Sequence, residues 1–306
     1  MKPRHLLAVL SLVPLLQACS STPESFAAQV QQAFESGDMD RVLAFSAIDD
    51  APADLRFFLL DQVRECGEAA TTCTAQAEPL DEPFKQSLGE LGAQGLETPQ
   101  MPEGLIVLTA KEADGKGSGT LKMPYAKVGG QYRLISQRYT AAKLAELRAT
   151  TNQQLLDAML AAGIYDMAAG ERRTDWKDTA TALPADGGEP GRALVRTSTA
   201  LYAAAQANDP DAAVASGNDF AKLMLSATDF GGKPVALDVR KAKLRTQSLR
   251  FLHDVRIGGG WQRGDEAVLL VDAKNGAGWI ERGALFLSKR DEGWGIAGKQ
   301  TISYPQ

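Results

Sequence analysis

The stretch that decides the fold is Ser36-Gly37-Asp38-Met39-Asp40. A second stretch, Ala207-Asn208-Asp209-Pro210-Asp211, has the same layout, which indicates that the chain contains a repeat. Each follows an apolar pattern with helical spacing, and each contains a residue, Gly37 or Asn208, that tolerates the left-handed conformation at a helix end. The aspartate that comes next is a good N-cap for another helix. In the second copy Pro210 stands at the first helical position, where its missing N–H costs nothing. The sequence therefore predicts a helix pair in each half of the chain.

Strand patterns follow each helix pair. The strands expected in the first half are 105–110, 120–123 and 131–137, with a glycine-rich turn at 115–119; those in the second half are Leu249–Ile257, 266–272, 279–288 and 294–303. Asn275-Gly276 predicts a type I′ hairpin turn, in which both positions need positive φ. The run Gly258-Gly259-Gly260-Trp261 is interpreted as a flexible hairpin tip. Each half thus runs from helices to strands, which predicts an α+β fold.

The two halves are joined by a segment of different character. An apolar stripe predicts a helix over 141–169, and the proline- and glycine-rich stretch 170–192 is typical of an exposed linker. We therefore expect a first domain over 25–140, a helical and polar linker over 141–192, and a second domain over 193–306.

Helices followed by a curved antiparallel meander resemble the cystatin-like cone of the nuclear-transport-factor and ketosteroid-isomerase superfamily. The resemblance is carried by Gly37-Asp38-x-Asp40 and Asn208-Asp209-x-Asp211, with the closing strands Gly130-Gln131-Tyr132-Arg133-Leu134 and Gly293-Trp294-Gly295-Ile296. It implies two tandem cone-like domains that each surround a pocket. The alternative is a generic α+β pair unrelated to that superfamily.

The N-terminal residues have the order of a secretory signal: Lys2 and Arg4 precede the apolar run Leu6–Leu16, which is too short to span a bilayer. Leu16-Gln17-Ala18-Cys19 resembles the lipobox of bacterial lipoproteins. The resemblance implies that residues 1–18 are removed, that Cys19 is lipidated and that residues 19–24 form a tether. Because Ser20 is not aspartate, it also implies the outer membrane, facing the periplasm. The inner membrane, surface exposure and a soluble secreted protein are the alternatives.

Charge and cysteine content narrow the class further. A net charge of -5 argues against a nucleic-acid partner, because phosphate recognition needs clustered Lys and Arg. Apart from Cys19 the chain has Cys66 and Cys73, which we interpret as a structural disulfide that closes a short loop in an oxidising compartment.

Candidate catalytic residues are few. His253 is the one histidine that remains after residues 1–18 are removed, so a His-rich metal site is excluded. Strand alternation places it on the face expected to be buried and Asp254 on the opposite face. We interpret it as a core histidine, with a pocket-facing polar group as the alternative. The acidic candidates Asp238, Asp265 and Asp272 are interpreted as solvated carboxylates at strand ends or turns. Trp261, Trp279 and Trp294 are interpreted as core residues, with the lining of a pocket as the alternative.

These features predict a non-enzymatic envelope lipoprotein without cofactor or metal, attached to a membrane through Cys19, that binds an envelope protein or a small ligand. One alternative is an isomerase or dehydratase that works in one cone pocket. Another is a periplasmic inhibitor or immunity lipoprotein.

Overall fold

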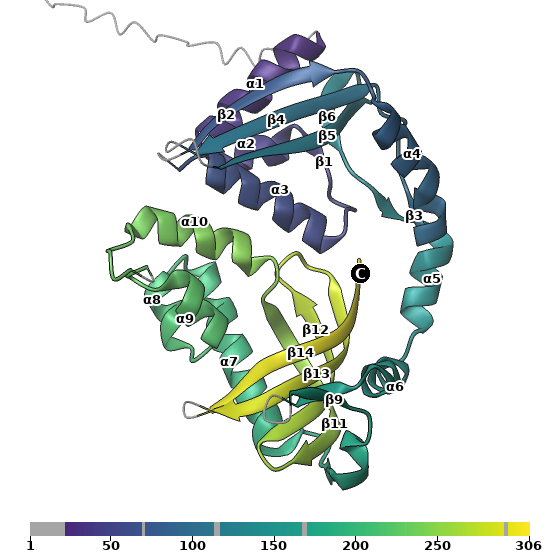
Figure 1. Ribbon diagram of the computed structural model, residues 1–306, viewed down its shortest axis with the longest axis vertical. Helices are drawn as coiled ribbons and strands as arrows, with labels where there is room; N and C mark the ends of the chain where they lie inside the picture. Colours follow the sequence, from purple (N-terminus) through teal and green to yellow (C-terminus); the bar gives the residue numbers. More distant parts are fainter. Residues whose placement is uncertain (1–21, 69–70, 113–116, 167–169, 230, 291–292) are drawn as a thin grey trace, which may run out of the picture.

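The computed structural model describes residues 22–68, 71–112, 117–166, 170–229, 231–290 and 293–306 (Figure 1). It confirms the α+β class. Each half of the chain combines helices with a five-stranded sheet. The signal segment, Cys19 and Ser20 lie outside the described residues, as do the first two residues of the glycine-rich turn at 115–119.

The first half contains α1, α2 and α3, with the short strand β1 between α2 and α3, and a sheet with the strand order β1-β6-β5-β4-β2, in which β1 runs parallel to β6. The strands predicted at 105–110, 120–123 and 131–137 are confirmed. Its elements are α1 (Pro23–Glu35), α2 (Met39–Ala44), β1 (Ser46–Ala47), α3 (Ala53–Cys66), β2 (Thr71–Glu78), α4 (Glu82–Glu90), the 3₁₀ turn η1 (Leu91–Gln94), β3 (Leu96–Glu97), β4 (Gly104–Glu112), β5 (Ser118–Val128), β6 (Gln131–Ile135) and β7 (Arg138–Tyr139).

The second half places four helices between the short strand β10 and the antiparallel meander β11–β14, and its sheet has the strand order β10-β11-β12-β13-β14. Just as α1 packs on β2, α7 packs on β11. Its elements are α7 (Gly188–Gln206), α8 (Pro210–Ala215), α9 (Asp219–Leu225), α10 (Leu237–Ser248), β11 (Leu252–Arg263), β12 (Glu266–Asn275), β13 (Ile280–Arg290) and β14 (Gly293–Tyr304).

The predicted helix ends are confirmed in both halves. Gly37 has φ +64° and Asn208 has φ +50°, so each ends its helix in the left-handed conformation. The Asp38 carboxylate accepts a hydrogen bond from the Arg41 N–H, and Asp209 caps α8 in the same way. The caps form as predicted because each involves residues only a few positions apart.

The Cys66–Cys73 disulfide is also confirmed, with an S–S distance of 2.00 Å. It joins the last residue of α3 to β2, so the helix is fixed covalently to an edge strand of the first sheet.

The segment between the halves differs from the prediction. The helix expected over 141–169 is broken into α5 (Ala141–Ala149) and α6 (Asn152–Ala162), because Thr151 caps a new helix and Gly163 ends it. The stretch 170–192 is largely exposed, as predicted, but it is not an irregular linker. It contains β9 (Glu171–Arg173), the 3₁₀ turn η2 (Trp176–Thr179), the sheet strand β10 (Thr181–Leu183) and the start of α7; β8 (Ile164–Asp166) precedes it and pairs with β9.

Burial of one aromatic side chain explains that error. Trp176 is 1% exposed and packs among buried residues of α6, β12 and β13. Its indole N–H donates a hydrogen bond to Glu266 on β12 at 2.8 Å. The polar composition of the segment hides this contact, because the partner lies 90 positions away in sequence.

The strand predicted over Leu249–Ile257 is partly wrong. Helix α10 continues to Ser248 and β11 begins at Leu252. Asp254 then adopts φ +51° and shifts the register between β11 and β12, so the expected alternation of faces is lost. The glycine run predicted as a hairpin tip lies within β11, where a second register shift falls between Ile257 and Gly260.

The β12–β13 hairpin forms as predicted, but not through a type I′ turn. Strand β12 ends at Asn275 and β13 begins at Ile280, so the loop is longer than two residues. Gly278, with φ +80°, supplies the left-handed residue. The Asn275 side chain accepts from the N–H groups of Ala277 and Trp279, which holds the loop closed.

The two halves meet along α3 and α10, while α4, α5 and α6 form an arc along one side of the molecule (Figure 1). We call the α3–α10 contact the helix interface. Arg245 of α10 forms an ion pair with Asp40, and Arg250 forms one with Asp54 at 2.8 Å. The Arg250 guanidinium carbon also lies 3.7 Å from the centre of the Phe57 ring. The halves are therefore held together by charged and aromatic contacts.

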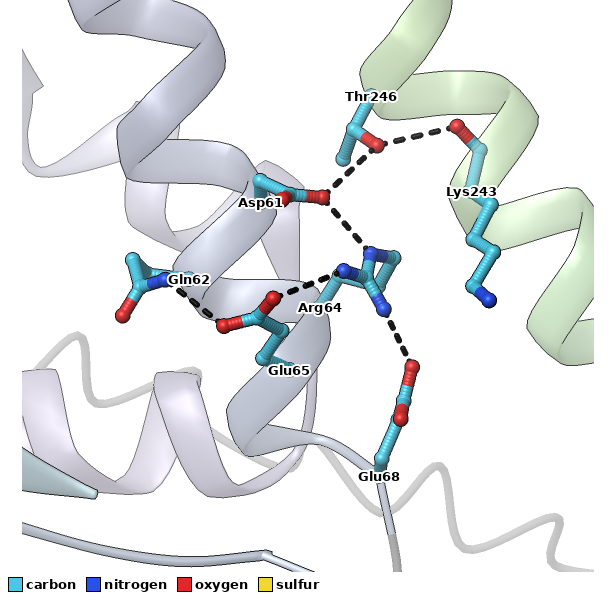
Figure 2. Close-up of polar contacts among 7 residues, drawn as sticks. All are labelled: Asp61, Gln62, Arg64, Glu65, Glu68, Lys243 and Thr246. Atoms are coloured by element: carbon cyan, nitrogen blue, oxygen red, sulfur yellow. Dashed lines mark hydrogen bonds and ion pairs between the residues drawn. The ribbon is translucent and has the colours of Figure 1, made fainter. Parts of the chain in front are cut away.

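Figure 2 shows the polar centre of the helix interface. The Arg64 side chain donates to Asp61 at 2.8 Å and also pairs with Glu65 and Glu68. Asp61 in turn accepts from the Thr246 hydroxyl of α10 at 3.3 Å. Burial lowers the pKa of Arg64, but the three carboxylates more than offset that effect and leave it raised. Arg64 therefore orients Asp61 toward the second half.

Candidate functional site

Each half contains a cavity between its helices and its sheet. The first cavity has a volume of about 220 Å³ and lies between α3, α4 and strands β5 and β6. Apolar side chains supply most of its surface. They include Ala51, Leu55, Phe58, Met123, Leu134 and Ile135.

The entrance of the first cavity is apolar as well. Leu55 and Phe58 are 38% and 57% exposed, although both side chains also line the cavity. Large apolar side chains that face water around a concave site are typical of a binding surface. A cavity of this volume is larger than the 150 Å³ apolar cavity that accommodates benzene in an engineered protein.

Two cations line this cavity and differ in their partners. Lys122 of β5 forms an ion pair with Asp81, the N-cap of α4, and this contact lowers the pKa of Asp81. The side chain of Arg56 of α3 forms no hydrogen bond or ion pair with any residue in the described ranges; it is partly exposed, but its Nε atom is buried. Arg56 is thus a cation without a counter-ion beside an apolar space.

The second cavity, of about 310 Å³, lies between α7, α9 and strands β13 and β14. It is more polar than the first. Gln247 contributes a buried side-chain oxygen without a hydrogen-bond partner, while Arg250 reaches it from the helix interface. Phe220 and Ile296, 45% and 44% exposed, lie at its edge. Because Arg250 also contacts Phe57 and Phe58, one side chain connects the two cavities.

His253, the weak candidate from the sequence, lines neither cavity. Its ring stacks on Tyr202 with the ring centres 4.0 Å apart, and its side chain is 15% exposed. Contrary to expectation, Asp254 lies beside it, with 3.6 Å between Nδ1 and Oδ2, because the positive φ of Asp254 breaks the strand alternation. Lys274 also pairs with Asp254 and is the main cause of its lowered pKa.

The acidic candidates lie outside both cavities too. Asp238 is in the first turn of α10 and Asp265 is in the β11–β12 turn, both exposed, while Asp272 pairs with Arg282 at 2.8 Å. Of the tryptophans, Trp279 is buried away from the cavities and Trp294 is buried against the second. Asp219 is the acidic residue that lines a cavity, and it pairs with Arg290 at 2.9 Å.

Within the described ranges, no cluster of three or more His, Cys, Asp or Glu side chains is arranged to hold a metal ion. In the same ranges, no helix combines the length and the apolar character that a membrane crossing requires.

Sequence reasoning missed Arg56, the residue that distinguishes the first cavity. The apolar spacing of Phe57, Leu60 and Val63 on the buried face of α3 is the signal that could have located the helix. That signal would still not have shown that Arg56 faces a cavity, because the opposite wall comes from β5 and β6.

Comparison with known proteins gives no relative: no protein-family model, no curated protein and no solved structure matches the chain.

Proposed function

We propose that the chain is a non-enzymatic lipoprotein of the bacterial envelope that binds a small apolar ligand in the first cavity. The observation that carries the proposal is the apolar cavity whose entrance is bordered by the exposed side chains of Leu55 and Phe58. Moving apolar surface from water into such a space contributes about 25 cal/mol for each Å² buried.

The site is built for binding rather than for acid–base chemistry. The residues that line the first cavity include no Asp, Glu, His or Tyr. In the second, the carboxylate of Asp219 is held in an ion pair. An isomerase or dehydratase needs a carboxyl group or histidine placed against its substrate. We therefore favour binding over catalysis.

Binding is tested with an alkyl alcohol that carries a photoreactive diazirine. Solubilised full-length protein is irradiated with this probe, and the labelled peptides are identified by mass spectrometry. We expect labelling of peptides from α3, β5 and β6. Ala51→Phe places a large side chain in the cavity and should abolish this labelling. Overpacking should lower the stability of the variant by about 1–3 kcal/mol. Thr197→Phe, which changes the second cavity, is the matched control and should label normally.

Thermal unfolding of both variants establishes that they remain folded. Undiminished labelling in a folded Ala51→Phe protein, or labelling confined to peptides remote from the first cavity, would refute ligand binding at this site.

The membrane attachment that we propose rests on the lipobox resemblance at Leu16-Gln17-Ala18-Cys19. Several acyl chains on one residue hold a protein at a membrane essentially permanently, whereas one chain binds only marginally. Cys19→Ala should therefore move the protein from the membrane fraction to the soluble fraction. A variant with Cys66 and Cys73 both changed to alanine controls for loss of a cysteine and should stay with the membrane. A Cys19→Ala protein that remains membrane-bound would disprove the lipid anchor.

A further inference from the structure

Arg56, which is partly exposed, differs in its partners from two other arginines that are partly or fully buried. Arg240, 5% exposed, donates to the Leu225 carbonyl oxygen at 2.8 Å and to Asp211 at 2.6 Å. Arg64 is surrounded by three carboxylates. Arg56 has no such partner among the described residues, although its Nε atom is shielded from water.

The shielded Nε–H group of Arg56 is unfavourable, because neither water nor a protein group accepts a hydrogen bond from it. An external anion at Arg56 would relieve this cost. The cavity also favours an anion at Arg56 in particular. Its lining contains no Asp or Glu that would repel an anion, and its other cation, Lys122, is already paired with Asp81.

The walls of the cavity away from Arg56 determine which chemistry the rest of the ligand must have. Its walls are formed mainly by aliphatic and aromatic side chains, and its volume of about 220 Å³ accommodates a body larger than benzene. A small hydrophilic anion would leave these walls without contacts. A neutral apolar molecule would leave the buried Nε–H group of Arg56 without a hydrogen-bond acceptor.

We propose that the first cavity binds a single-chain amphipathic anion, with its apolar chain between α3 and the sheet and its carboxylate on Arg56. The proposal rests on the function proposed above, since it specifies the ligand of the same cavity. A guanidinium presents two parallel N–H donors whose spacing matches the two oxygens of a carboxylate. The opening beside Leu55 and Phe58 lets the chain of a longer ligand extend toward solvent.

The test compares two photoreactive probes of equal chain length, one ending in a carboxylate and the other in a hydroxyl. For wild-type protein, we expect the carboxylate probe to reach half-maximal labelling at a concentration at least about tenfold lower, which corresponds to about 1.4 kcal/mol. Unlabelled decanoate should compete better than 1-decanol. Arg56→Met, which keeps the apolar stem but not the charge, should remove both differences while labelling by the hydroxyl probe persists.

Two controls separate charge from structure. Arg56→Lys keeps the charge without the two-pronged geometry and should retain part of the preference. Arg196→Met removes an exposed arginine of α7 that lines neither cavity and should leave the preference unchanged.

The outcomes distinguish this proposal from the one on which it rests. Equal labelling by both probes in wild-type protein, blocked by Ala51→Phe, would overturn the anion and leave the apolar site standing. A preference for carboxylate that survives in Arg56→Met would also overturn it. Absence of specific labelling by either probe would overturn both proposals.

Discussion

Gly260 lies where β11 passes so close to β12 that a side chain does not fit. A Cβ atom at this position would lie 2.2 Å from the Val268 carbonyl oxygen. Two residues earlier, a Cβ at Gly258 would meet its nearest neighbour at 3.6 Å, an ordinary contact. The same glycine run therefore contains one position at which glycine is required and one at which it is not.

This difference predicts opposite outcomes for two alanine substitutions. Gly260→Ala should destabilise the protein by about 1–3 kcal/mol, because the strands must separate to admit the methyl group. Gly258→Ala has room and should leave stability nearly unchanged. Urea denaturation of the two variants measures the difference. Equal stability would show that the run is a flexible tip, as the sequence suggested, and not part of a sheet.

At the scale of elements, α4 is attached to the first sheet through its N-cap. Asp81 accepts from the Phe84 N–H at 2.8 Å and pairs with Lys122 of β5. The hydrogen bond with Lys122 is the main cause of the lowered pKa of Asp81, and the Phe84 N–H adds to it. One carboxylate thus begins the helix and fixes it beside the first cavity.

The lowered pKa predicts the direction of a pH effect. The folded-state pKa of Asp81 lies below its ordinary value of 3.8. The ionised carboxylate therefore stabilises the fold fully above the ordinary pKa, and this stabilisation is lost as the pH falls through the lowered, folded-state pKa. Asp81→Asn keeps a good N-cap but loses the charge. Its Tm should be lower than that of wild type near neutral pH, and the gap should narrow below about pH 4.

Thermal unfolding followed by circular dichroism measures this gap. A difference in Tm that stays constant down to about pH 2 would mean that the ion pair with Lys122 contributes nothing.

At the scale of the whole molecule, α10 collects contacts from both helix pairs. Asp40 and Asp211 occupy equivalent positions in the two repeated stretches, and both pair with arginines of α10, Arg245 and Arg240. One contact crosses between the halves and the other stays within the second half. The repeated motif thus ends a helix and also supplies an anchor for α10.

Arg250 joins the two halves, because it contacts Asp54 and Phe57 across the helix interface. Arg250→Ala should lower the free energy of unfolding by about 1 kcal/mol, the sum expected for an exposed ion pair and an exposed cation–π contact. Calorimetry should show the two halves unfolding at more separated temperatures.

A double-mutant cycle with Asp54→Ala isolates the ion pair. Arg256→Ala, at an exposed position of β11, is the control and should have little effect. An Arg250→Ala protein that unfolds like wild type would mean that the halves are held together without this contact.

The sequence by itself determined features that depend on neighbouring residues. The helix ends at Gly37 and Asn208, the caps at Asp38 and Asp209 and the disulfide of Cys66 and Cys73 all involve residues within a few positions of each other. Their energetics are local, so the pattern of residue types suffices to predict them.

Tertiary structure alone decided the features that join distant residues. Trp176 is buried in an apolar cluster with residues of α6, β12 and β13 and donates its N–H to Glu266. Glycine is required at position 260 because the Val268 carbonyl oxygen leaves no room for a Cβ atom. Arg56 faces a cavity whose other wall is formed by strands that follow it by more than sixty positions. No local pattern encodes such proximity, because a side chain, or a single polar atom such as the Arg56 Nε, becomes buried only when the chain brings both walls together.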